Sequence, residues 1–187
     1  HYPLRRQRQM CIRDRPDIGL ADVAGGEVDV AIRYGRGTWP GVRARRLMPE
    51  RLSVVCAPAL VAGKRRPRTP DDLLRYPLLA SHTKHPFEWD AWARRFGLDL
   101  GRAQTVRLHD YNIVVEAALA GQGLAMGRHR MIAAQLASGA LVQALPDTVL
   151  EDARIGWWFI SPRGKVNDTA QAFHAWLADA AASDSTH

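Results

Sequence analysis

Strand-like segments alternate with helix-like segments along most of this chain. Val28, Val30 and Ile32 alternate with polar or small residues, which is the two-residue period of a half-buried strand. The segment 88–96 instead repeats its large apolar residues every three or four positions, as a helix with one buried face does. Strands interleaved with helices predict an α/β fold with largely parallel sheets.

The same patterns give approximate bounds for each element. We expect strands at residues 28–32, 42–48, 52–57, 77–81, 106–109, 123–127, 140–144 and 155–160. We expect helices at residues 70–75, 88–96, 110–120, 131–137 and 168–180. In the last helix, Phe173, Trp176, Leu177 and Ala180 are expected to face the core.

Length and composition limit the class of protein. A chain of 187 residues with 47% hydrophobic residues can form one sizeable core, or two small lobes that share one. The apolar runs fall short of the ~20 residues that a membrane span needs, so we expect no membrane partner. The two cysteines lack a CxxC spacing, and Cys56 falls in an apolar strand. These features favour reduced thiols and a cytoplasmic location.

The basic charge does not indicate a DNA-binding surface within this chain. The net charge is +7, and the first 18 residues supply +3 of it through five arginines and two aspartates. The remaining charge is scattered rather than gathered on one helix. Residues 1–18 show no clear period, and the MCIRDR piece resembles read-through at the ends of gene fragments. We expect this segment to be poorly ordered and not part of the natural protein.

Metal and cofactor motifs are weak. His82 and His85 could form a metal pair, with His109 and His129 further on, but no cysteine or carboxylate stands at ligand spacing. The glycines of Gly121–Gly127 follow a helix and enter a strand, the reverse of a dinucleotide-binding turn. We therefore expect no metal and no cofactor.

Catalytic motifs are equally weak. Ser53, His174 and Asp147 could formally supply a hydrolytic triad, but nothing resembles a nucleophile elbow. His109 and Asp110 are the best candidates for acid–base work. No residue is predicted to be catalytic, and we expect the protein not to be an enzyme.

Three strand ends carry polar residues suited to ligand binding, because open α/β folds bind ligands at the carboxyl edge of the sheet. At the first, Asp110 and Asn112 can cap the following helix only, or cap it and also contact a ligand. At the second, Arg33 can pair with a carboxylate ligand, or with Asp29 or Glu50. The third would deliver Ser81 and His82 to a cleft. Together they favour a pocket between two lobes.

Five segments in register resemble one family. They are EVDVAIRYGRGTWPGVRARRLMPERLSVVCAPAL at 27–60, DDLLRYPLL at 71–79, WDAW followed by FGL at 89–98, AALAGQGLA at 117–125 and AFHAWL at 172–177. Their order and spacing, from about residue 20 to 180, are similar to the effector-binding domain of LysR-type transcriptional regulators. The resemblance is to the subgroup of the glycine-cleavage-operon activator.

The resemblance implies a two-lobed fold like that of type 2 periplasmic binding proteins, with two crossover strands at about residues 52–57 and 153–160. Residues 19–52 and 160–187 would form lobe I, and residues 53–159 lobe II. A small-molecule effector, such as an anion or an amino-acid-like metabolite, would bind between them. The residues implied to contact the effector are Tyr34 and Gly35 from lobe I, and His82, Asp110, Tyr111, Asn112 and Gly127 from lobe II.

The chain also departs from the family pattern. The winged helix-turn-helix, the linker helix and the opening strands of lobe I are not recognised, so we expect a truncated chain with an incomplete first lobe. Operator DNA would be bound only by the missing N-terminal domain, and the full-length parent would be a homodimer or homotetramer. The alternatives are a solute-binding protein of a transporter, which shares the two lobes, and a small-molecule enzyme on an α/β scaffold.

Overall fold

The computed structural model describes residues 22–63, 66–82, 87–164 and 166–184. The expectation for residues 1–18 lies outside this range. The strands are β1 (Ala31–Gly35), β2 (Val42–Cys56), β3 (Leu78–Ser81), β4 (Thr105–Leu108), β5 (Leu124–Arg128), β6 (Val142–Gln143) and β7 (Leu150–Pro162). The α-helices are α1 (Phe87–Phe96), α2 (Tyr111–Leu119), α3 (Ala133–Ala137) and α4 (Asp168–Asp184). Short 3-10 helices cover Pro58–Val61, Pro70–Arg75 and Leu100–Arg102.

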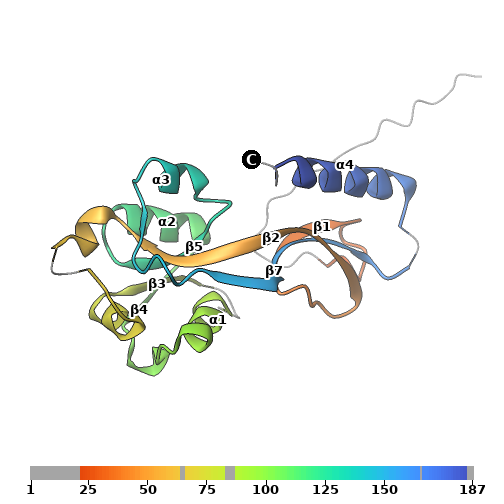
Figure 1. Ribbon diagram of the computed structural model, residues 1–187. Helices are drawn as coiled ribbons and strands as arrows, with labels where there is room; N and C mark the ends of the chain where they lie inside the picture. Colours follow the sequence, from red (N-terminus) through yellow and green to blue (C-terminus); the bar gives the residue numbers. More distant parts are fainter. Residues whose placement is uncertain (1–21, 64–65, 83–86, 165, 185–187) are drawn as a thin grey trace, which may run out of the picture.

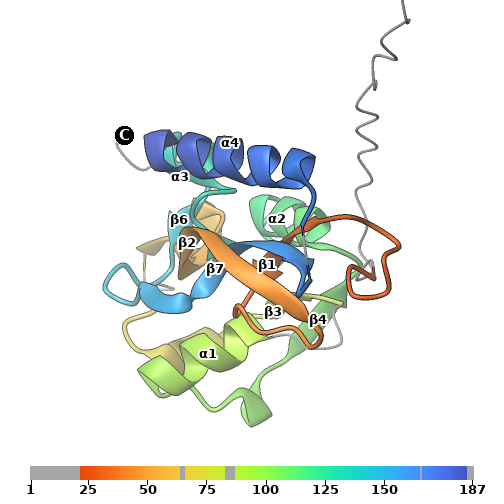
Figure 2. The ribbon, with the colours of Figure 1, turned by 90° about the vertical axis from the view of Figure 1, so that its right-hand side faces the viewer.

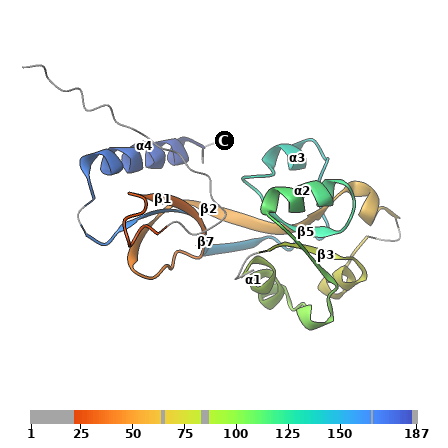
Figure 3. The ribbon, with the colours of Figure 1, turned by 180° about the vertical axis from the view of Figure 1, so that it is seen from behind.

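Two long antiparallel strands, β2 and β7, run through the whole molecule and connect its two ends (Figure 1). At one end lie β1, α4 and the adjoining halves of β2 and β7, which we call the α4 lobe. At the other end lie α1, α2, α3 and the strands β3 to β6, which we call the α1–α3 lobe. The view from behind shows the same two groups, with the long strands β2 and β7 running from one to the other (Figure 3).

The prediction of separate strands at 42–48 and 52–57 was wrong, because β2 is a single strand of 15 residues. It pairs with β7 from Val42 opposite Pro162 to Leu52 opposite Leu150. The register shifts twice, between Arg46 and Met48 and again between Pro49 and Arg51. Such irregularities bend a strand without ending it. Residues 49–51, which lie between the two predicted strands, are part of the bent segment of this one crossover strand.

The sheet is mixed, so the expectation of largely parallel sheets was also wrong. Its strand order is β1-β7-β2-β5-β3-β4, with β6 beside β2. Only β3 pairs in parallel, with β4 and β5, and the other pairings are antiparallel. Because the crossovers run in opposite directions and pair with strands of both lobes, they make the sheet continuous and antiparallel at its centre.

The buried apolar residues that the structure describes form three clusters. The largest one gathers the buried faces of α1, β2, β3 and β5 around Trp92 and Leu52, both fully buried. A second cluster, around Val114 and Ile132, lies under α2 and α3. The α4 lobe holds a small cluster around Val42 and Ile160. Viewed from the α4 end, α4 and α1 lie on opposite sides of the long strands (Figure 2).

Helix α4 packs differently from the sequence prediction. Trp176 was expected in the core but is 64% exposed, and Ala180 is also exposed. The helix contacts the sheet through Phe173 and His174, whose rings pack against Phe159. The period correctly predicted a helix here, but it did not predict which of its residues are buried. No helix in the described part of the chain is long and apolar enough to cross a membrane.

Candidate functional site

Arg128 occupies the junction between the two lobes. It is the last residue of β5, and its backbone N–H donates a hydrogen bond of 2.7 Å to the hydroxyl oxygen of Tyr111, the first residue of α2. The Arg128 guanidinium lies over the Tyr111 ring, 3.9 Å from its centroid, and over the Tyr34 ring, 4.0 Å from its centroid. Tyr34 belongs to β1 in the α4 lobe. One cation therefore joins an aromatic ring from each lobe.

Glu88 on α1 supplies the opposite charge. The Nε of Arg128 donates to the Glu88 Oε1 at 2.7 Å, and the side chains are only 13% and 14% exposed. Burial alone would lower the pKa of Arg128, but Glu88 more than offsets this and the net shift is upward. Burial also raises the pKa of both tyrosine hydroxyls, so they stay neutral at physiological pH. Glu88 is therefore the group that neutralises Arg128.

An aromatic layer surrounds the Tyr34 ring. Its centroid lies 5.2 Å from that of Trp157 on β7 and 5.7 Å from that of Phe87 on α1. The Tyr34 hydroxyl is buried close to Glu88, but without a properly aligned hydrogen bond. We call Tyr34, Glu88, Tyr111, Arg128 and Trp157 the Arg128 cluster.

A buried carboxylate holds the crossovers beside this cluster. Glu50 on β2 is 2% exposed. Its Oε1 accepts hydrogen bonds from the backbone N–H groups of Arg51 and Arg130, at 3.0 and 3.1 Å, and its Oε2 accepts one from the Trp157 indole at 3.2 Å. Glu50 thus ties β2 to β7 and to the segment that follows β5, where the register of β2 shifts.

Tyr34 and Tyr111, two of the residues predicted to contact the effector, both pack against the Arg128 guanidinium. Gly35 follows Tyr34 directly and leaves room for Trp39, which a Cβ would meet at 2.8 Å. Gly127 is buried in β5, where a Cβ would meet Ile132 at 2.7 Å. The two glycines therefore allow close packing beside Tyr34 and Arg128.

Asp110 and Asn112 begin α2. The Asp110 side chain accepts hydrogen bonds from the N–H groups of Asn112 and Ile113, so it caps the helix. Asn112 is exposed. His82 is exposed as well, and its backbone N–H donates to the Leu108 carbonyl at 2.6 Å. His82 thus lies near the end of β4, but no contact joins its side chain to the Arg128 cluster among the described residues.

A small pocket lies against the cluster on the α1–α3 side. Its polar lining comes from Ser81, Glu88 and Tyr111, and its apolar lining from Leu79, Ala80, Trp89, Val114 and Met126. The volume open to water is about 10 Å³. That is room for about one water molecule.

Sequence reasoning missed Arg128, Glu88, Trp157 and the bond between Ser53 and His129. The rule that polar residues at strand ends face a ligand also applies to Arg128, which directly follows the predicted strand 123–127. Glu88 and Trp157 carry no such signal, because their position depends on how α1 and β7 pack.

Arg33 does not join the cluster. Its guanidinium lies 6.0 Å from the centroid of the Trp39 ring, and the charge of Asp22 acts on it. Glu50, one of the two acidic residues considered as a partner of Arg33, bonds to Trp157 and to backbone N–H groups. Successive residues of a strand point to opposite faces, which separates Arg33 from Tyr34.

The catalytic and metal candidates do not assemble. Ser53 bonds to His129, with 2.7 Å between Oγ and Nε2, and not to His174. Ser53 is fully buried, so its hydroxyl has no route to a substrate. No group of three or more potential metal ligands occurs among the described residues, which do not include His85. His109 lies 3.6 Å from Asp110 and its side chain is 73% exposed, which does not form an acid–base pair in a pocket.

The chain matches the model of the LysR substrate binding domain over residues 14–182. It is 36% identical over 138 residues to the glycine cleavage system transcriptional activator of Escherichia coli K12, an alignment that covers 73% of this chain and 43% of that protein. It is 32% identical over 164 residues to the transcriptional activator AmpR of Pseudomonas aeruginosa, with 86% and 53% covered. The chain therefore spans about half the length of these relatives.

Solved structures that resemble this chain include effector domains of the same kind of regulator. The effector domain of AmpR from Pseudomonas aeruginosa superposes with a TM-score of 0.71 at 30% identity, covering 87% of this chain and 76% of that one. The AmpR effector-binding domain from Citrobacter freundii gives a TM-score of 0.67 at 27% identity, with 87% and 78% covered. The relatives are transcriptional regulators, which favours a regulator over the solute-binding protein and the enzyme considered as alternatives. This chain, with its two lobes and paired crossover strands, belongs to the LysR substrate-binding domain family.

Proposed function

We propose that this chain is the sensor of a LysR-type transcriptional regulator and that its effector carries a carboxylate that binds Arg128. The observation that carries the proposal is the position of Arg128 between Tyr34 of the α4 lobe and Tyr111 of the α1–α3 lobe. A ligand at this point contacts both lobes, so its binding changes how they fit together. We place the remaining predicted residues, Gly35, His82, Asp110, Asn112 and Gly127, around the same site.

The chemistry of Arg128 favours a planar anion. Two rings cover the faces of the guanidinium, which leaves its edge as the binding surface. Guanidinium edges pair bidentately with carboxylates. Glu88 already binds the Nε side at 2.7 Å, which supports a carboxylate as the ligand of this edge. An effector carboxylate can share this edge with Glu88 or replace it.

An amino acid satisfies both charges of the pair. Its carboxylate would bind Arg128 and its ammonium group would bind Glu88, so neither buried charge would be left alone. The Escherichia coli relative is named for the glycine cleavage system, which makes glycine a suitable first probe. Larger amino acids and simple carboxylates test how much of the zwitterion the site requires.

Binding must be coupled to a change in the lobes. A pocket of about 10 Å³ is too small for an amino acid. In this proposal, the arrangement in which Tyr34 covers Arg128 is the closed one. An effector would favour a second arrangement in which the rings separate, and the ratio of the two states would follow its differential affinity.

The wider assignments belong to the same proposal. We divide the chain into lobe I at 19–52 and 160–187 and lobe II at 53–159, with residues 1–18 outside both. The register shift of β2 between Pro49 and Arg51, close to the first boundary, supports this division. The parent protein would act in the cytoplasm as a homodimer or homotetramer. It would bind operator DNA through a part outside this chain.

Calorimetric titration of the full chain tests the proposal. Glycine, larger amino acids, acetate and succinate are titrated into the wild type, Arg128→Gln and a matched control, Arg107→Gln. Arg107 is an exposed arginine on β4. We expect one class of carboxylate to bind the wild type and the control, and Arg128→Gln to lose at least about tenfold in affinity, or ~1.4 kcal/mol. Equal affinity in Arg128→Gln would contradict the proposal.

A further inference from the structure

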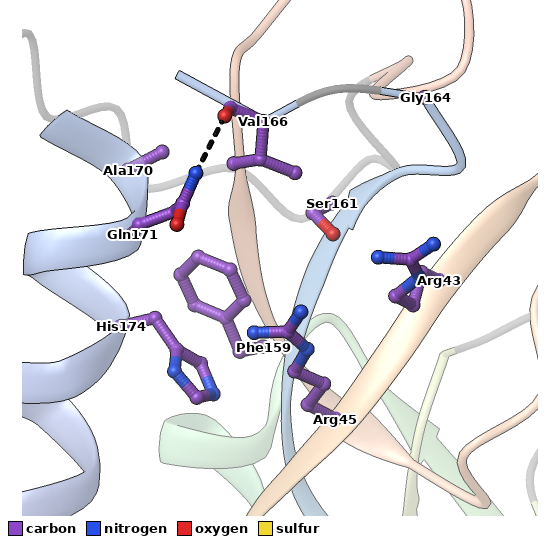
Figure 4. Close-up of a pocket in the computed structure, with 9 residues that line it drawn as sticks. All are labelled: Arg43, Arg45, Phe159, Ser161, Gly164, Val166, Ala170, Gln171 and His174. Atoms are coloured by element: carbon purple, nitrogen blue, oxygen red, sulfur yellow. Dashed lines mark hydrogen bonds between the residues drawn. The ribbon is translucent and has the colours of Figure 1, made fainter. Parts of the chain in front are cut away.

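A second cavity lies in the α4 lobe, between α4 and the outer halves of β2 and β7 (Figure 4). Its volume is about 260 Å³. It is lined by Arg43, Arg45, Phe159, Ser161, Gly164, Val166, Ala170, Gln171 and His174. It shares no residue with the Arg128 cluster or with the small pocket beside it.

The lining of this cavity is positively charged. Arg43 and Arg45 are two positions apart on β2, so both side chains project from the same face of the strand. Neither guanidinium has an ion-pair partner among the residues that the structure describes. Arg43 donates one hydrogen bond of 3.3 Å to the Arg163 carbonyl. No aspartate or glutamate is among the described residues that line the cavity, so the two arginines give this lining a positive charge.

The remaining walls give the cavity a defined shape. Phe159, 2% exposed, forms an apolar floor, and the His174 ring packs edge-on against it at 4.8 Å. The Gln171 carboxamide donates to the Val166 carbonyl at 2.9 Å, which fixes its orientation at the rim. Two guanidinium groups above an apolar floor suit a small anion with a compact carbon body.

We propose that this cavity is a second ligand site, which binds a small anionic metabolite through Arg43 and Arg45. A volume of 260 Å³ is slightly below the ~300 Å³ at which pockets for drug-sized ligands begin, so the ligand is a small molecule. Carboxylates and phosphates share the chemistry that two guanidinium groups recognise. Titration with succinate and with inorganic phosphate distinguishes these two classes of anion.

Occupancy of this site would act on the same strands that join the lobes. The bound anion would reduce the repulsion between Arg43 and Arg45. It would also connect β2 to α4, because Gln171 and His174 of α4 line the same cavity. Both β2 and β7 continue from this cavity, past the register shifts, to Glu50 and Trp157. A ligand here would therefore stabilise the α4 lobe and alter the crossovers at a distance from Arg128.

The test titrates inorganic phosphate, succinate and uncharged succinamide into the full chain and follows the thermal midpoint in parallel. Four proteins are compared: wild type, Arg43→Gln/Arg45→Gln, Arg107→Gln and Arg128→Gln. We expect one anion to bind and raise the midpoint in wild type, Arg107→Gln and Arg128→Gln, and succinamide to have no effect. The double variant should lose at least about tenfold in affinity. Binding of phosphate alone or succinate alone identifies the class of ligand.

Unchanged anion affinity of the α4-lobe cavity in Arg128→Gln would show that this site is independent of the proposed sensor site. Unchanged anion affinity in the double variant would overturn it. Equal losses in the double variant and in Arg107→Gln would also overturn it, because the effect would then reflect net charge only. The single variant Arg45→Gln, at an exposed position, provides a second measurement if the double variant is poorly folded.

Discussion

Asp110 illustrates how one side chain can satisfy a structural requirement at a predicted ligand site. Its Oδ1 accepts hydrogen bonds from the N–H of Asn112 at 2.8 Å and of Ile113 at 3.2 Å. The bond from Ile113 is the main cause of a pKa below the usual aspartate range. Of the two readings of Asp110 left open by the sequence, capping is present in the structure, and ligand contact stays a prediction.

Two substitutions of Asp110 distinguish the stabilising effect of its helix cap from that of its negative charge. We expect Asp110→Ala to lower the thermal midpoint at pH 7, because α2 loses the acceptor at its first turn. Asp110→Asn should keep most of the stability, since asparagine caps equally well. With its folded pKa depressed, the Asp110 contribution is full above the ordinary pKa of about 4 and disappears as the pH falls further. Equal midpoints for Asp110→Ala and wild type would contradict the cap.

His129 should make stability depend on pH at mild acidity. Its burial, and then the charge of Arg51, lower its pKa, while Glu151 acts in the opposite direction. A histidine with a depressed folded pKa stabilises fully above the unfolded value of about 6.5, and this contribution is lost as the pH falls below it. The difference in thermal midpoint between pH 7.5 and 5.5 should therefore be smaller in His129→Gln than in wild type. An unchanged difference would show that His129 does not titrate in this way.

At the scale of elements, the helices were easier to predict than their contacts. The apolar period correctly predicted α1, α2 and α4, because a helix that buries one face repeats its large residues every three or four positions. It did not show that Trp176 of α4 is stacked on Phe173 and open to solvent. The apolar period indicates which side of a helix faces the protein. Which residues on that side are buried depends on the sheet against which the helix packs.

The packing of α4 predicts two very different substitutions. Trp176→Gln should change the free energy of unfolding by less than about 1 kcal/mol, because the residue is 64% exposed. Phe159→Ala should cost about 3–5 kcal/mol, because that ring is buried beneath the helix. Denaturant unfolding of both variants gives the comparison. A larger loss in Trp176→Gln would mean that α4 packs through the tryptophan.

At the scale of the molecule, the bend of the crossovers is the feature that sets the lobes relative to each other. Gly156 on β7 faces the register shifts of β2, and a Cβ there would collide with the Met48 carbonyl oxygen and the Pro49 backbone. We expect Gly156→Ala to destabilise the protein by about 1–3 kcal/mol. For a chain of this size, that lowers the thermal midpoint by ~2–12 °C. The matched control is Gly164→Ala, where a Cβ meets nothing within 4 Å. Similar midpoints in the two variants would contradict the tight approach of the crossovers.

The family resemblance of the sequence predicted the two-lobed fold, but only two of the five residues of the Arg128 cluster. Tyr34 and Tyr111 were predicted because the family resemblance implies that residues at their positions contact the effector. Glu88 and Trp157 reach Arg128 from α1 and β7, and their contacts depend on the crossing of separate elements. The single long β2 was missed for a similar reason: its charged middle is held by pairing with β7, which no local pattern reveals.

The structure of the protein bound to the carboxylate identified by titration tests the central claim most directly. We predict that the ligand carboxylate lies within about 2.7–2.9 Å of the Arg128 guanidinium, with Tyr34 displaced from its closed position. A ligand bound elsewhere, with Arg128, Glu88 and Tyr34 in the arrangement described above, would contradict the assignment of the sensor site.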